Sequence, residues 1–362
     1  MTRPRFHVLL ILLIALPSLA AKKASKSDGG PRQYLDRPDD WFGGDEAKQI
    51  AANILSYQSS LGGWPKNVDT TAKIYDGDPT RLKPTFDNKA TVDELRFLAH
   101  AFDVTKGPKY QAAVEKGVDY ILKAQYPSGG WPQFYPPDNS YHRYITFNDD
   151  VMVRVMELLR DTYTSDRFAF LDAARKKSAK TEFDLGVQCI LKCQIKVDGK
   201  LTAWCAQHDE KTYAPTPGRS FELTSISGSE SVGVVELLMS LDDPSREVVQ
   251  SIQGAIAWFE SAKLPGIKVD QQDAPDTIKG HDRVVAQDTS APPMWARFYD
   301  IKTNKPIFSD RDGIPKTELA EIGDERRNGY RWLDYWPQTL LDTEYPAWKT
   351  KWAAKLVVPT TQ

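Results

Sequence analysis

Apolar and polar positions along the chain recur in a pattern that predicts a series of helices. Three similar apolar segments each end in glutamine, at Ile54–Gln58, Ile121–Gln125 and Ile190–Gln194. The glutamines lie 67 residues apart (58 to 125) and then 69 residues apart (125 to 194), and a weaker fourth copy ends at Lys263. This period is longer than that of solenoid repeats, roughly 20–50 residues, and it suits a pair of helices with long functional loops.

A second apolar segment follows in each repeat, at 90–99, 151–159 and 231–238. Within it apolar side chains recur at i, i+3 and i+7, as Val92, Leu95 and Ala99 illustrate. This spacing predicts a helix with more than one buried face. Helix pairs repeated around an axis predict an all-α fold, an α/α toroid.

The first two glutamines are followed by Gly-Gly-Trp-Pro, at 62–65 and 129–132. The resulting Gln-x-x-x-Gly-x-Trp pattern resembles the repeat motif of triterpene cyclases, but 147–150 (Phe-Asn-Asp-Asp) does not match the acidic Asp-x-Asp-Asp motif of those enzymes. We therefore expect a structural role. The glutamine would bind free carbonyl groups at the helix end, and the tryptophan would pack over the next helix.

The N-terminal residues predict export. Arg3 and Arg5 precede an apolar run, 8–16, that is too short to span a bilayer, and small residues follow at 18–20. These features are typical of a secretory signal peptide. We expect a signal peptide at 1–20, a flexible linker at 21–39 and one catalytic domain at 40–355. The mature protein would be secreted, extracellular or periplasmic, with no attachment to a membrane.

Charge narrows the choice of partners. The 362 residues carry a formal net charge of −2, which gives no general attraction to nucleic acid or to anionic membranes. We expect neither as a partner, and we expect the protein to act as a monomer. An anionic substrate would need a local cluster of cations.

Three cysteines, Cys189, Cys193 and Cys205, fall in the third repeat. Export makes a disulfide possible, but Cys193 replaces Ala124 of the preceding repeat, which favours a small buried apolar residue. We expect no zinc site, because His208 is the one histidine nearby.

Oxygen-bearing side chains precede the second helices of adjacent repeats. Asp87 with Asn88, and Asn148 with Asp149, occupy equivalent places, and Glu230 begins the third such helix. Repeat symmetry therefore predicts that they share one rim of the toroid. Converging oxygen ligands suit Ca²⁺, which takes roughly six to eight of them. Two alternatives stay open at this point: helix caps with no further role, and the acid and base of an inverting glycosidase.

Three arginines lie in polar segments. Arg219 is in a long loop, rich in proline and glycine, that follows Trp204, and Arg297 and Arg311 lie in a later cationic segment. Long loops on a rigid scaffold commonly carry functional residues, and an arginine fork suits a carboxylate. Each arginine alone also suits a surface ion pair.

Several motifs together resemble those of pectate lyases. They are Gly-Gly-Trp-Pro-Lys-Asn (62–67), Phe-Asp-Asn-x-Ala-Thr (86–91), Gly-Gly-Trp-Pro-Gln-Phe-Tyr-Pro (129–136), Ile-Thr-Phe-Asn-Asp (145–149), Thr-Ala-Trp-Cys-Ala-Gln-His-Asp (202–209), Arg-Ser-Phe-Glu (219–222), Ser-Gly-Ser-Glu-Ser (227–231) and Arg-Phe-Tyr-Asp (297–300). Over roughly residues 40–350 the chain is similar to family 10 polysaccharide lyases, which are α/α toroids. The resemblance implies Ca²⁺-dependent cleavage of α-1,4-polygalacturonate by anti β-elimination, with 4,5-unsaturated products.

The same resemblance implies roles for individual residues. Arg297 and Arg311 match arginines that bind substrate carboxylates. Asp149, together with Asp87, matches the acidic positions that bind calcium, and Asn88 is expected to assist there and to contact substrate.

Arg219 matches the arginine that acts as Brønsted base on the C5 proton. That proton is only weakly acidic beside a carboxylate anion, so Ca²⁺ and arginines have to stabilise the charge that develops there. A free guanidinium has a pKa above about 12, so we expect an alkaline optimum. If Arg219 only binds substrate, Lys211 is the first alternative base. An inverting glycosidase and a non-catalytic polyuronate-binding protein are the alternative functions.

Overall fold

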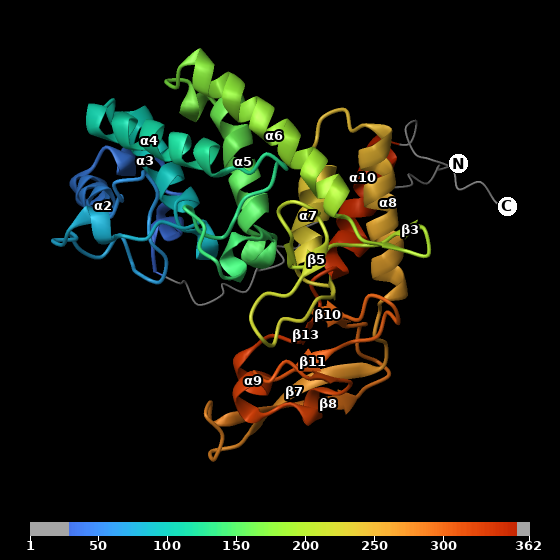
Figure 1. Ribbon diagram of the computed structural model, residues 1–362. Helices are drawn as coiled ribbons and strands as arrows, with labels where there is room; N and C mark the ends of the chain where they lie inside the picture. The colour runs from blue at the N-terminus through green and yellow to red at the C-terminus, as the bar shows by residue number, and fades with distance from the viewer. Residues whose placement is uncertain (1–28, 353–362) are drawn as a thin grey trace, which may run out of the picture.

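The computed structural model describes residues 29–352 (Figure 1). Its helical part repeats a pattern of long helices. In chain order the α-helices of the described residues are α1 (Asp39–Phe42), α2 (Asp45–Ser56), α3 (Val92–Thr105), α4 (Pro108–Ala124), α5 (Val151–Thr164), α6 (Ala173–Cys193), α7 (Glu230–Met239), α8 (Arg246–Ser261), α9 (Asp324–Gly329) and α10 (Tyr345–Lys351). The helices predicted near 90–99, 151–159 and 231–238 are confirmed as α3, α5 and α7.

Short strands connect and extend the helices. They are β1 (Ile145–Thr146), β2 (Lys196–Val197), β3 (Lys200–Leu201), β4 (Gln207–His208), β5 (Pro215–Thr216), β6 (Ile226–Ser227), β7 (Ile267–Asp273), β8 (His281–Gln287), β9 (Trp295–Ala296), β10 (Phe298–Tyr299), β11 (Phe308–Ser309), β12 (Pro315–Lys316) and β13 (Leu333–Asp334). Within 29–352 they form six small antiparallel sheets, the largest with the order β1-β4-β5.

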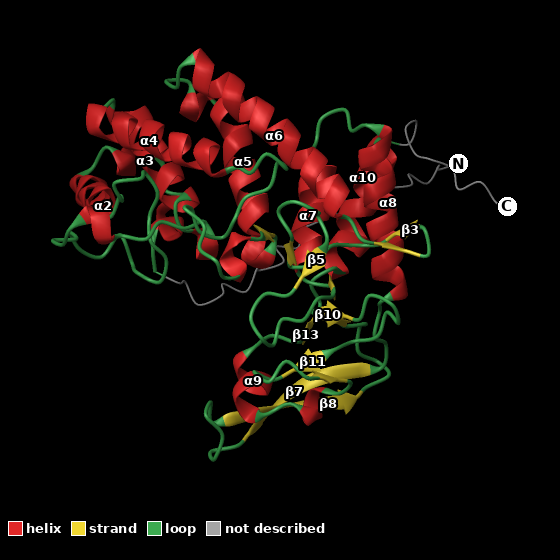
Figure 2. Cartoon of the chain, in the orientation of Figure 1, coloured by secondary structure: helices red, strands yellow, loops and turns green. Residues whose placement is uncertain are grey.

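The prediction of an all-α toroid is wrong. Figure 2 shows helices in the upper part of the molecule and a β-rich part below them, which the last third of the chain builds around the β7–β8 hairpin. Helices α3 and α4 pack together, as do α5 and α6, and α7 and α8. The fourth repeat departs from this pattern because the β7–β8 hairpin follows α8 where the earlier repeats pass to another long helix.

The glutamine and tryptophan of each repeat have the structural role expected of them, but the glutamine binds a turn carbonyl and one inside the next helix instead of free carbonyls at a helix end. Gln125 Nε2 donates to the carbonyl oxygens of Gly129 and Glu182, at 2.8 Å each. The Trp131 indole donates to the carbonyl of Ile121 at 3.0 Å. Gly129 has φ +91°, and a Cβ there would lie 2.4 Å from the Leu185 carbonyl oxygen, so the close approach of the turn to α6 requires glycine.

The other repeats use the same bonds. Gln58 and Gln194 each donate to two carbonyls in the same manner, and the Trp64 and Trp204 indoles donate to the carbonyls of Ile54 and Ile190. The weak fourth copy keeps the tryptophan bond. Trp295 donates to the Phe259 carbonyl at 2.9 Å, although the β7–β8 hairpin separates the two residues in sequence.

Backbone pairs between the loops align successive repeats. Thr85 pairs with Phe134, Ile145 with His208 and Ile226 with Tyr299, in each case antiparallel. These pairs satisfy backbone groups that buried loops would otherwise leave unpaired. They also fix the start of each second helix relative to the next repeat, which places the functional residues.

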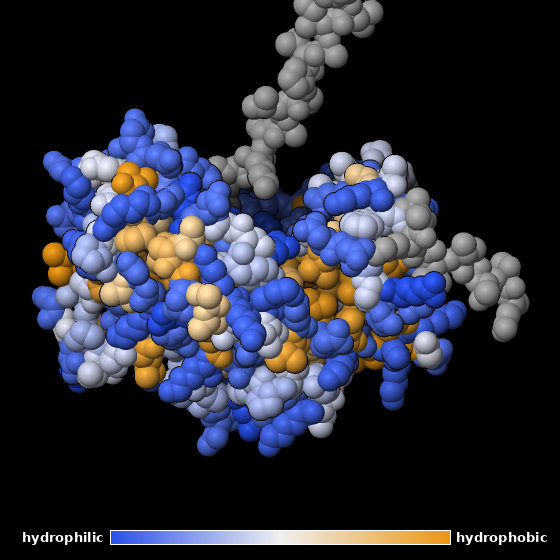
Figure 3. All heavy atoms as spheres, turned by 90° about the horizontal axis from the view of Figure 1, so that it is seen from above, coloured by the Kyte–Doolittle hydropathy of each residue, from blue (hydrophilic) through white to orange (hydrophobic). Residues whose placement is uncertain are grey.

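The predicted signal peptide at 1–20 lies outside the described residues, as do residues 21–28 of the predicted linker. In the described remainder of that linker, Tyr34 stacks on Trp41 with ring centroids 5.3 Å apart. From residue 29 to residue 352, no helix has the length and apolar character needed to cross a bilayer. Seen from above, apolar side chains form separate patches among hydrophilic ones (Figure 3).

The three cysteines are buried and have free thiols. Cys193 is 2% exposed and packs as the small apolar residue that its repeat position predicts. Burial raises the pKa of Cys205 above its ordinary value, so its thiol stays protonated.

Candidate active site

Equivalent turns begin the second helices and form a rim of polar side chains. Asn88 lies in a 3-10 turn, Asp87–Lys89, and Asp149 lies in the corresponding turn, Asn148–Asp150. Both residues have φ 52°, with ψ 35° and 30°. The match confirms that the two turns are equivalent. Asparagine and aspartate tolerate this left-handed conformation better than most residues.

We call Asp87, Asp149 and Glu230 the rim carboxylates. Burial raises the pKa of Asp149, the charge of Arg297 opposes that rise, and the negative charges of Glu230 and Asp87 add to it. Arg297 contacts both Asp149 and Glu230, and the turn Asp87–Lys89 packs against α5, which begins two residues after Asp149, so the three carboxylates lie near one another. The shared rim predicted from the repeats is thus confirmed, in a fold that is not all-α.

Two rim carboxylates are already paired with cations. Glu230 forms a short ion pair with Arg297, and the side chains are 2% and 11% exposed. The antiparallel pair of β6 with β10 places Arg297 beside Glu230, because Phe298 pairs with Ser227. Asp87 forms an ion pair with Lys66.

Asp149 is the rim carboxylate with an open side. Its side chain is 42% exposed, and Arg297 Nη2 lies 3.8 Å from its Oδ1. Its other oxygen accepts a hydrogen bond of 2.7 Å from Asn148 Nδ2. Asn88 lies further along the rim and donates to Asn67 Oδ1 at 3.3 Å.

Arg219 is held by a buried carboxylate. Its Nη2 donates to Glu222 Oε1 at 2.5 Å, and its backbone amide donates to Glu222 Oε2 at 2.9 Å. Burial works against the charged form of Arg219, but the hydrogen bond and charge of Glu222 outweigh it and raise the pKa of Arg219. Burial likewise opposes ionisation of Glu222, and Arg219 still lowers its pKa. Both groups are therefore charged in the unliganded protein.

Tyr330 joins the two arginines. Its hydroxyl donates to Glu222 Oε1 at 2.8 Å. Its ring centroid lies 4.7 Å from Arg297 Cζ and 5.6 Å from Arg219 Cζ. Because both guanidinium groups contact the same ring, Arg219 and Arg297 belong to one site.

Arg311 lies at the outer edge of this site. It is 65% exposed and forms a fork with Glu325, with Nε–Oε2 at 2.9 Å and Nη2–Oε1 at 2.8 Å. Its Cζ lies 5.9 Å from the centroid of Phe221, the ring that also contacts Arg219 at 4.9 Å. Each residue predicted as a site residue therefore lies on the rim or beside the arginines next to it.

Sequence reasoning missed three partners, namely Lys66, the carboxylate of Glu222 as the anchor of Arg219, and Tyr330. The sequence does contain a signal for Lys66, because this lysine follows Trp-Pro at the position where the second repeat has glutamine (131–133). Tyr330 left none, because its partners are distant in sequence.

A metal at this rim has a limited set of ligands. Among residues 29–352 there is no group of three or more His, Cys, Asp or Glu side chains placed to hold a metal ion. The oxygen donors at the rim still suit a hard cation, with Asp149 most open to it. Because Lys66 and Arg297 engage the other two carboxylates, the protein alone offers fewer oxygens than the roughly six to eight that Ca²⁺ takes.

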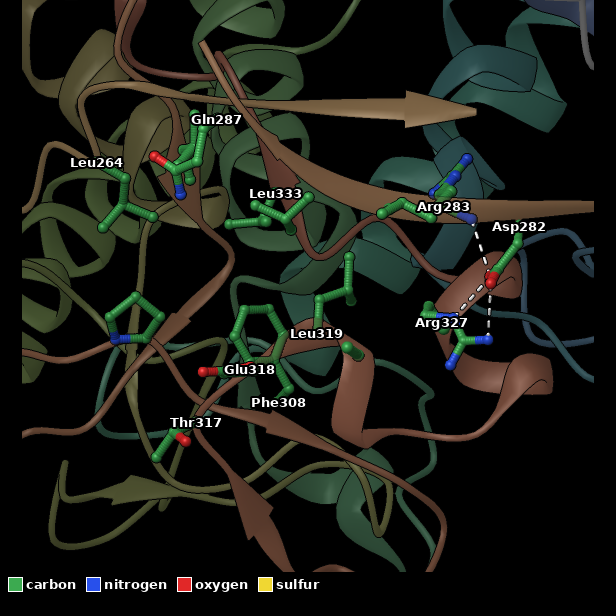
Figure 4. Close-up of a pocket in the computed structure, with 15 residues that line it drawn as sticks. Leu264, Asp282, Arg283, Gln287, Phe308, Thr317, Glu318, Leu319, Arg327 and Leu333 are labelled. Atoms are coloured by element: carbon green, nitrogen blue, oxygen red, sulfur yellow. Dashed lines mark hydrogen bonds and ion pairs between the residues drawn. The ribbon is translucent and has the colours of Figure 1, made fainter. Parts of the chain in front are cut away.

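Two cavities differ in character. A polar cavity of about 820 Å³ adjoins the rim and is lined by Asp149, Glu230 and Arg297, among others. A second cavity, of about 580 Å³, lies beneath the β7–β8 hairpin (Figure 4). Leu264, Phe308, Leu319 and Leu333 line it, with the Asp282–Arg327 ion pair at one end. Its mainly apolar wall does not suit a polyanion, so the rim is the better candidate.

Comparison with known proteins agrees with this choice. Residues 58–341 match the family model described as pectic acid lyase. The fold is similar to a family 10 polysaccharide lyase from Cellvibrio cellulosa, with 34% identity, a TM-score of 0.75, and 85% of this chain and 96% of that chain covered. It is similar, with 33% identity and the same TM-score, to an aspartate-to-alanine mutant of that lyase in complex with trigalacturonic acid, covering 85% of this chain and 97% of that one. A search among curated proteins gave no match.

Proposed function

Because the chain belongs to the pectic acid lyase family, it is a pectate lyase, and we propose that it cleaves α-1,4-polygalacturonate by Ca²⁺-dependent anti β-elimination with Arg219 as the base. The observation that carries this proposal is that Arg297 lies beside Asp149 and shares the ring of Tyr330 with Arg219. A uronate polymer presents a carboxylate on every sugar, and this rim offers cations to receive them. The trigalacturonic acid bound to the similar Cellvibrio cellulosa protein supports this substrate class.

The reaction breaks the C5–H and C4–O bonds and forms a C4=C5 double bond. Arg219 takes the C5 proton, the electron pair of that bond forms the double bond, and the glycosidic oxygen leaves with the bonding electrons and receives a proton from water. Negative charge builds on the carboxylate attached to C5 during proton removal. Preorganised cations at that carboxylate lower the barrier, and one such donor is worth about 2.7–4 kcal/mol in enzymes where it has been removed.

Arg297 and Arg311 would hold the carboxylates. Arg297 is fixed by Glu230, so it offers a preorganised guanidinium with little freedom to lose on binding. Arg311 is exposed and held by Glu325, so a substrate carboxylate would exchange places with that glutamate. The two arginines therefore suit different tasks. Arg297 would bind the carboxylate of the reacting sugar, and Arg311 would bind the carboxylate of a neighbouring sugar.

Calcium would be held chiefly by Asp149, with Asp87 and Asn88 beside it and substrate carboxylates completing its coordination. The small number of free oxygens at the rim supports this shared arrangement. When bound, the ion would supply positive charge that makes the C5 proton more acidic.

Arg219 has to lose its proton before it can act as a base. Glu222 stabilises the charged form, whereas calcium and the neighbouring arginines oppose it once substrate is bound. A high pH supplies the neutral form, so the alkaline optimum expected from the sequence remains part of the proposal.

An inverting glycosidase is the weaker alternative. It needs one carboxyl group free to give a proton and another free to activate water. The pairs of Asp87 with Lys66 and Glu230 with Arg297 engage two of the three rim carboxylates, so neither is free for these roles.

The decisive experiment follows unsaturated products from polygalacturonate by ultraviolet absorbance at alkaline pH, with calcium and with a chelator. Absorbance that appears with calcium and disappears with chelator supports the proposal. Reducing ends without absorbance would favour the glycosidase, and binding without either product would favour a non-catalytic module.

A further inference from the structure

Tyr330 contacts Arg297 directly, and it contacts Glu222, the carboxylate that holds Arg219. We propose that Tyr330 is a positioning residue that sets the distance and angle between these two arginines. The kinetic consequence of this inference rests on the proposed function. In that function Arg219 is the base and Arg297 binds the substrate carboxylate, so the distance between their guanidinium groups is the distance between these two roles.

The hydroxyl of Tyr330 acts on Arg219 through a shared oxygen. Glu222 Oε1 accepts from Tyr330 at 2.8 Å and from Arg219 Nη2 at 2.5 Å. A carboxylate oxygen with two donors on fixed directions has little freedom to rotate, so the guanidinium has a fixed partner. Burial raises the pKa of Tyr330 well above its ordinary value, and the hydroxyl stays a donor at alkaline pH.

The ring of Tyr330 acts on Arg297 directly. Arg297 Cζ lies 4.7 Å from the ring centroid, within the range of a cation–π contact. The Nε of Arg297 is buried and has no hydrogen-bond partner among the described residues. The ring face therefore supplies attraction to a guanidinium whose hydrogen bonds go to one side only, toward Glu230 and Asn148.

Tyr330 is itself held on several sides. Its ring meets Phe221 and Trp332 edge-on, with centroids 5.3 and 5.2 Å apart. Its carbonyl accepts from Arg283 Nη1 of β8 at 3.0 Å. Because the β-rich part of the molecule fixes this ring, it serves as a rigid spacer between the Arg219 loop and the β9–β10 segment.

Two substitutions separate the two contacts. Tyr330→Phe keeps the ring and removes the hydroxyl, so we expect kcat to fall about tenfold while KM stays near the wild-type value. Tyr330→Leu removes both, so we expect a larger fall in kcat together with a KM raised several-fold. Tyr213→Phe and Tyr213→Leu are the control pair, because Lys192 Nζ lies 5.1 Å from the Tyr213 ring centroid and donates to its hydroxyl at 3.5 Å. We expect wild-type kinetics from both.

A second measurement reports on the mobility of the two arginine side chains in the absence of substrate. In protein labelled with ¹⁵N-arginine, hydrogen exchange at Nε–Hε should quicken for Arg219 alone in Tyr330→Phe and for both arginines in Tyr330→Leu. Unchanged exchange in both variants would overturn the inference, as would wild-type kinetics for Tyr330→Leu or a raised KM with unchanged kcat for Tyr330→Phe. If the wild-type protein yields no unsaturated product and the exchange still changes as described, the proposed function falls and the positioning role stands.

Discussion

Both oxygens of the Glu222 carboxylate bind Arg219, one at the guanidinium at 2.5 Å and the other at the backbone amide at 2.9 Å. The pair keeps Arg219 charged, although the proposed reaction needs it neutral. Tyr141 and Tyr330 act on Arg219 more weakly than Glu222 does, and burial raises their own pKa values. The charge of Arg219 also reaches Asp149 and Arg311. Glu222 is therefore the group that sets the protonation of Arg219 in the unliganded protein.

We predict that Glu222→Gln moves the pH profile of kcat to lower pH. Removing the negative charge lowers the pKa of Arg219, so the neutral base is reached at lower pH. At a given pH the amount of neutral base rises about tenfold each time this pKa falls by one. Measuring kcat on polygalacturonate from neutral to strongly alkaline pH checks this. A profile that stays in place, or moves to higher pH, would show that the protonation of Arg219 does not limit the rate.

A substitution at Arg219 itself tests the base role. Arg219→Lys keeps the positive charge but loses the fork and shortens the reach. We expect kcat to fall about a hundredfold or more with substrate affinity largely kept, because a base acts mainly in the transition state. Arg175→Lys is the matched control, since Arg175 forks onto Asp119 on another face, with both contacts at 2.8 Å. Normal turnover with only a raised KM would make Arg219 a clamp and direct attention to Lys211.

Asp149 tests the role of calcium. We expect Asp149→Asn to abolish turnover and to weaken calcium binding measured by calorimetry with substrate present, while thermal unfolding changes little because the side chain is 42% exposed. Asparagine suits the left-handed backbone, φ 52°, so no strain is added. Asp150→Asn is the control, because that carboxylate pairs with Arg154 at 3.3 Å. Full activity of Asp149→Asn in the presence of chelator would refute the metal site.

Arg297 and Arg311 should differ in their effect on stability. Arg297→Ala leaves Glu230 buried without its counter-ion, so we expect a loss of about 3–5 kcal/mol in the free energy of unfolding together with weaker substrate binding. Arg311→Ala breaks an exposed pair, so we expect no measurable change in unfolding and a raised KM. Urea unfolding and Michaelis kinetics on both variants distinguish the two. Unchanged kinetic constants in both would make these arginines purely structural.

The helix repeats could be predicted because burial imposes a period on the sequence. The glutamine and tryptophan of each repeat recur because each makes the same bonds, as Gln125 does with Gly129 and Glu182. The two-residue strands have no such period. Some pair the loops of adjacent repeats, as β1 does with β4, and others pair within one loop, as β2 does with β3. The β7–β8 hairpin was missed because its residues are only half-buried or exposed, which leaves little contrast between its two faces.

The positions of the site residues could be predicted only for residues that lie at equivalent places in the repeats. Asp87, Asp149 and Glu230 share a rim because they begin equivalent helices. The contact of Tyr330 with Glu222 joins residues 108 positions apart, and no repeat or motif in the sequence predicts this contact. The pair of Glu230 with Arg297 depends on the pairing of β6 with β10, which the helix pattern does not contain.

Glu94 lowers the stability of the folded protein at alkaline pH. It is buried on α3 and accepts a hydrogen bond from Thr70 Oγ1 at 3.0 Å. Burial raises its pKa from 4.5 to about 8. Because the folded state holds the proton to higher pH than the unfolded state, stability is full below pH 4.5, falls as the pH rises toward 8 and stays low above it.

We therefore predict that Glu94→Gln and the wild type have similar free energies of unfolding near pH 4, and that the variant is more stable near pH 9 by a few kcal/mol. Urea unfolding at both pH values measures this, with Glu260→Gln as the control because that side chain is 51% exposed and pairs with Lys263. An equal difference between variant and wild type at both pH values would show that Glu94 ionises alike in the folded and unfolded states. Since an arginine base favours alkaline conditions, Glu94→Gln should also prolong activity at the pH where the proposed reaction is fastest, which a time course of product formation at that pH would reveal.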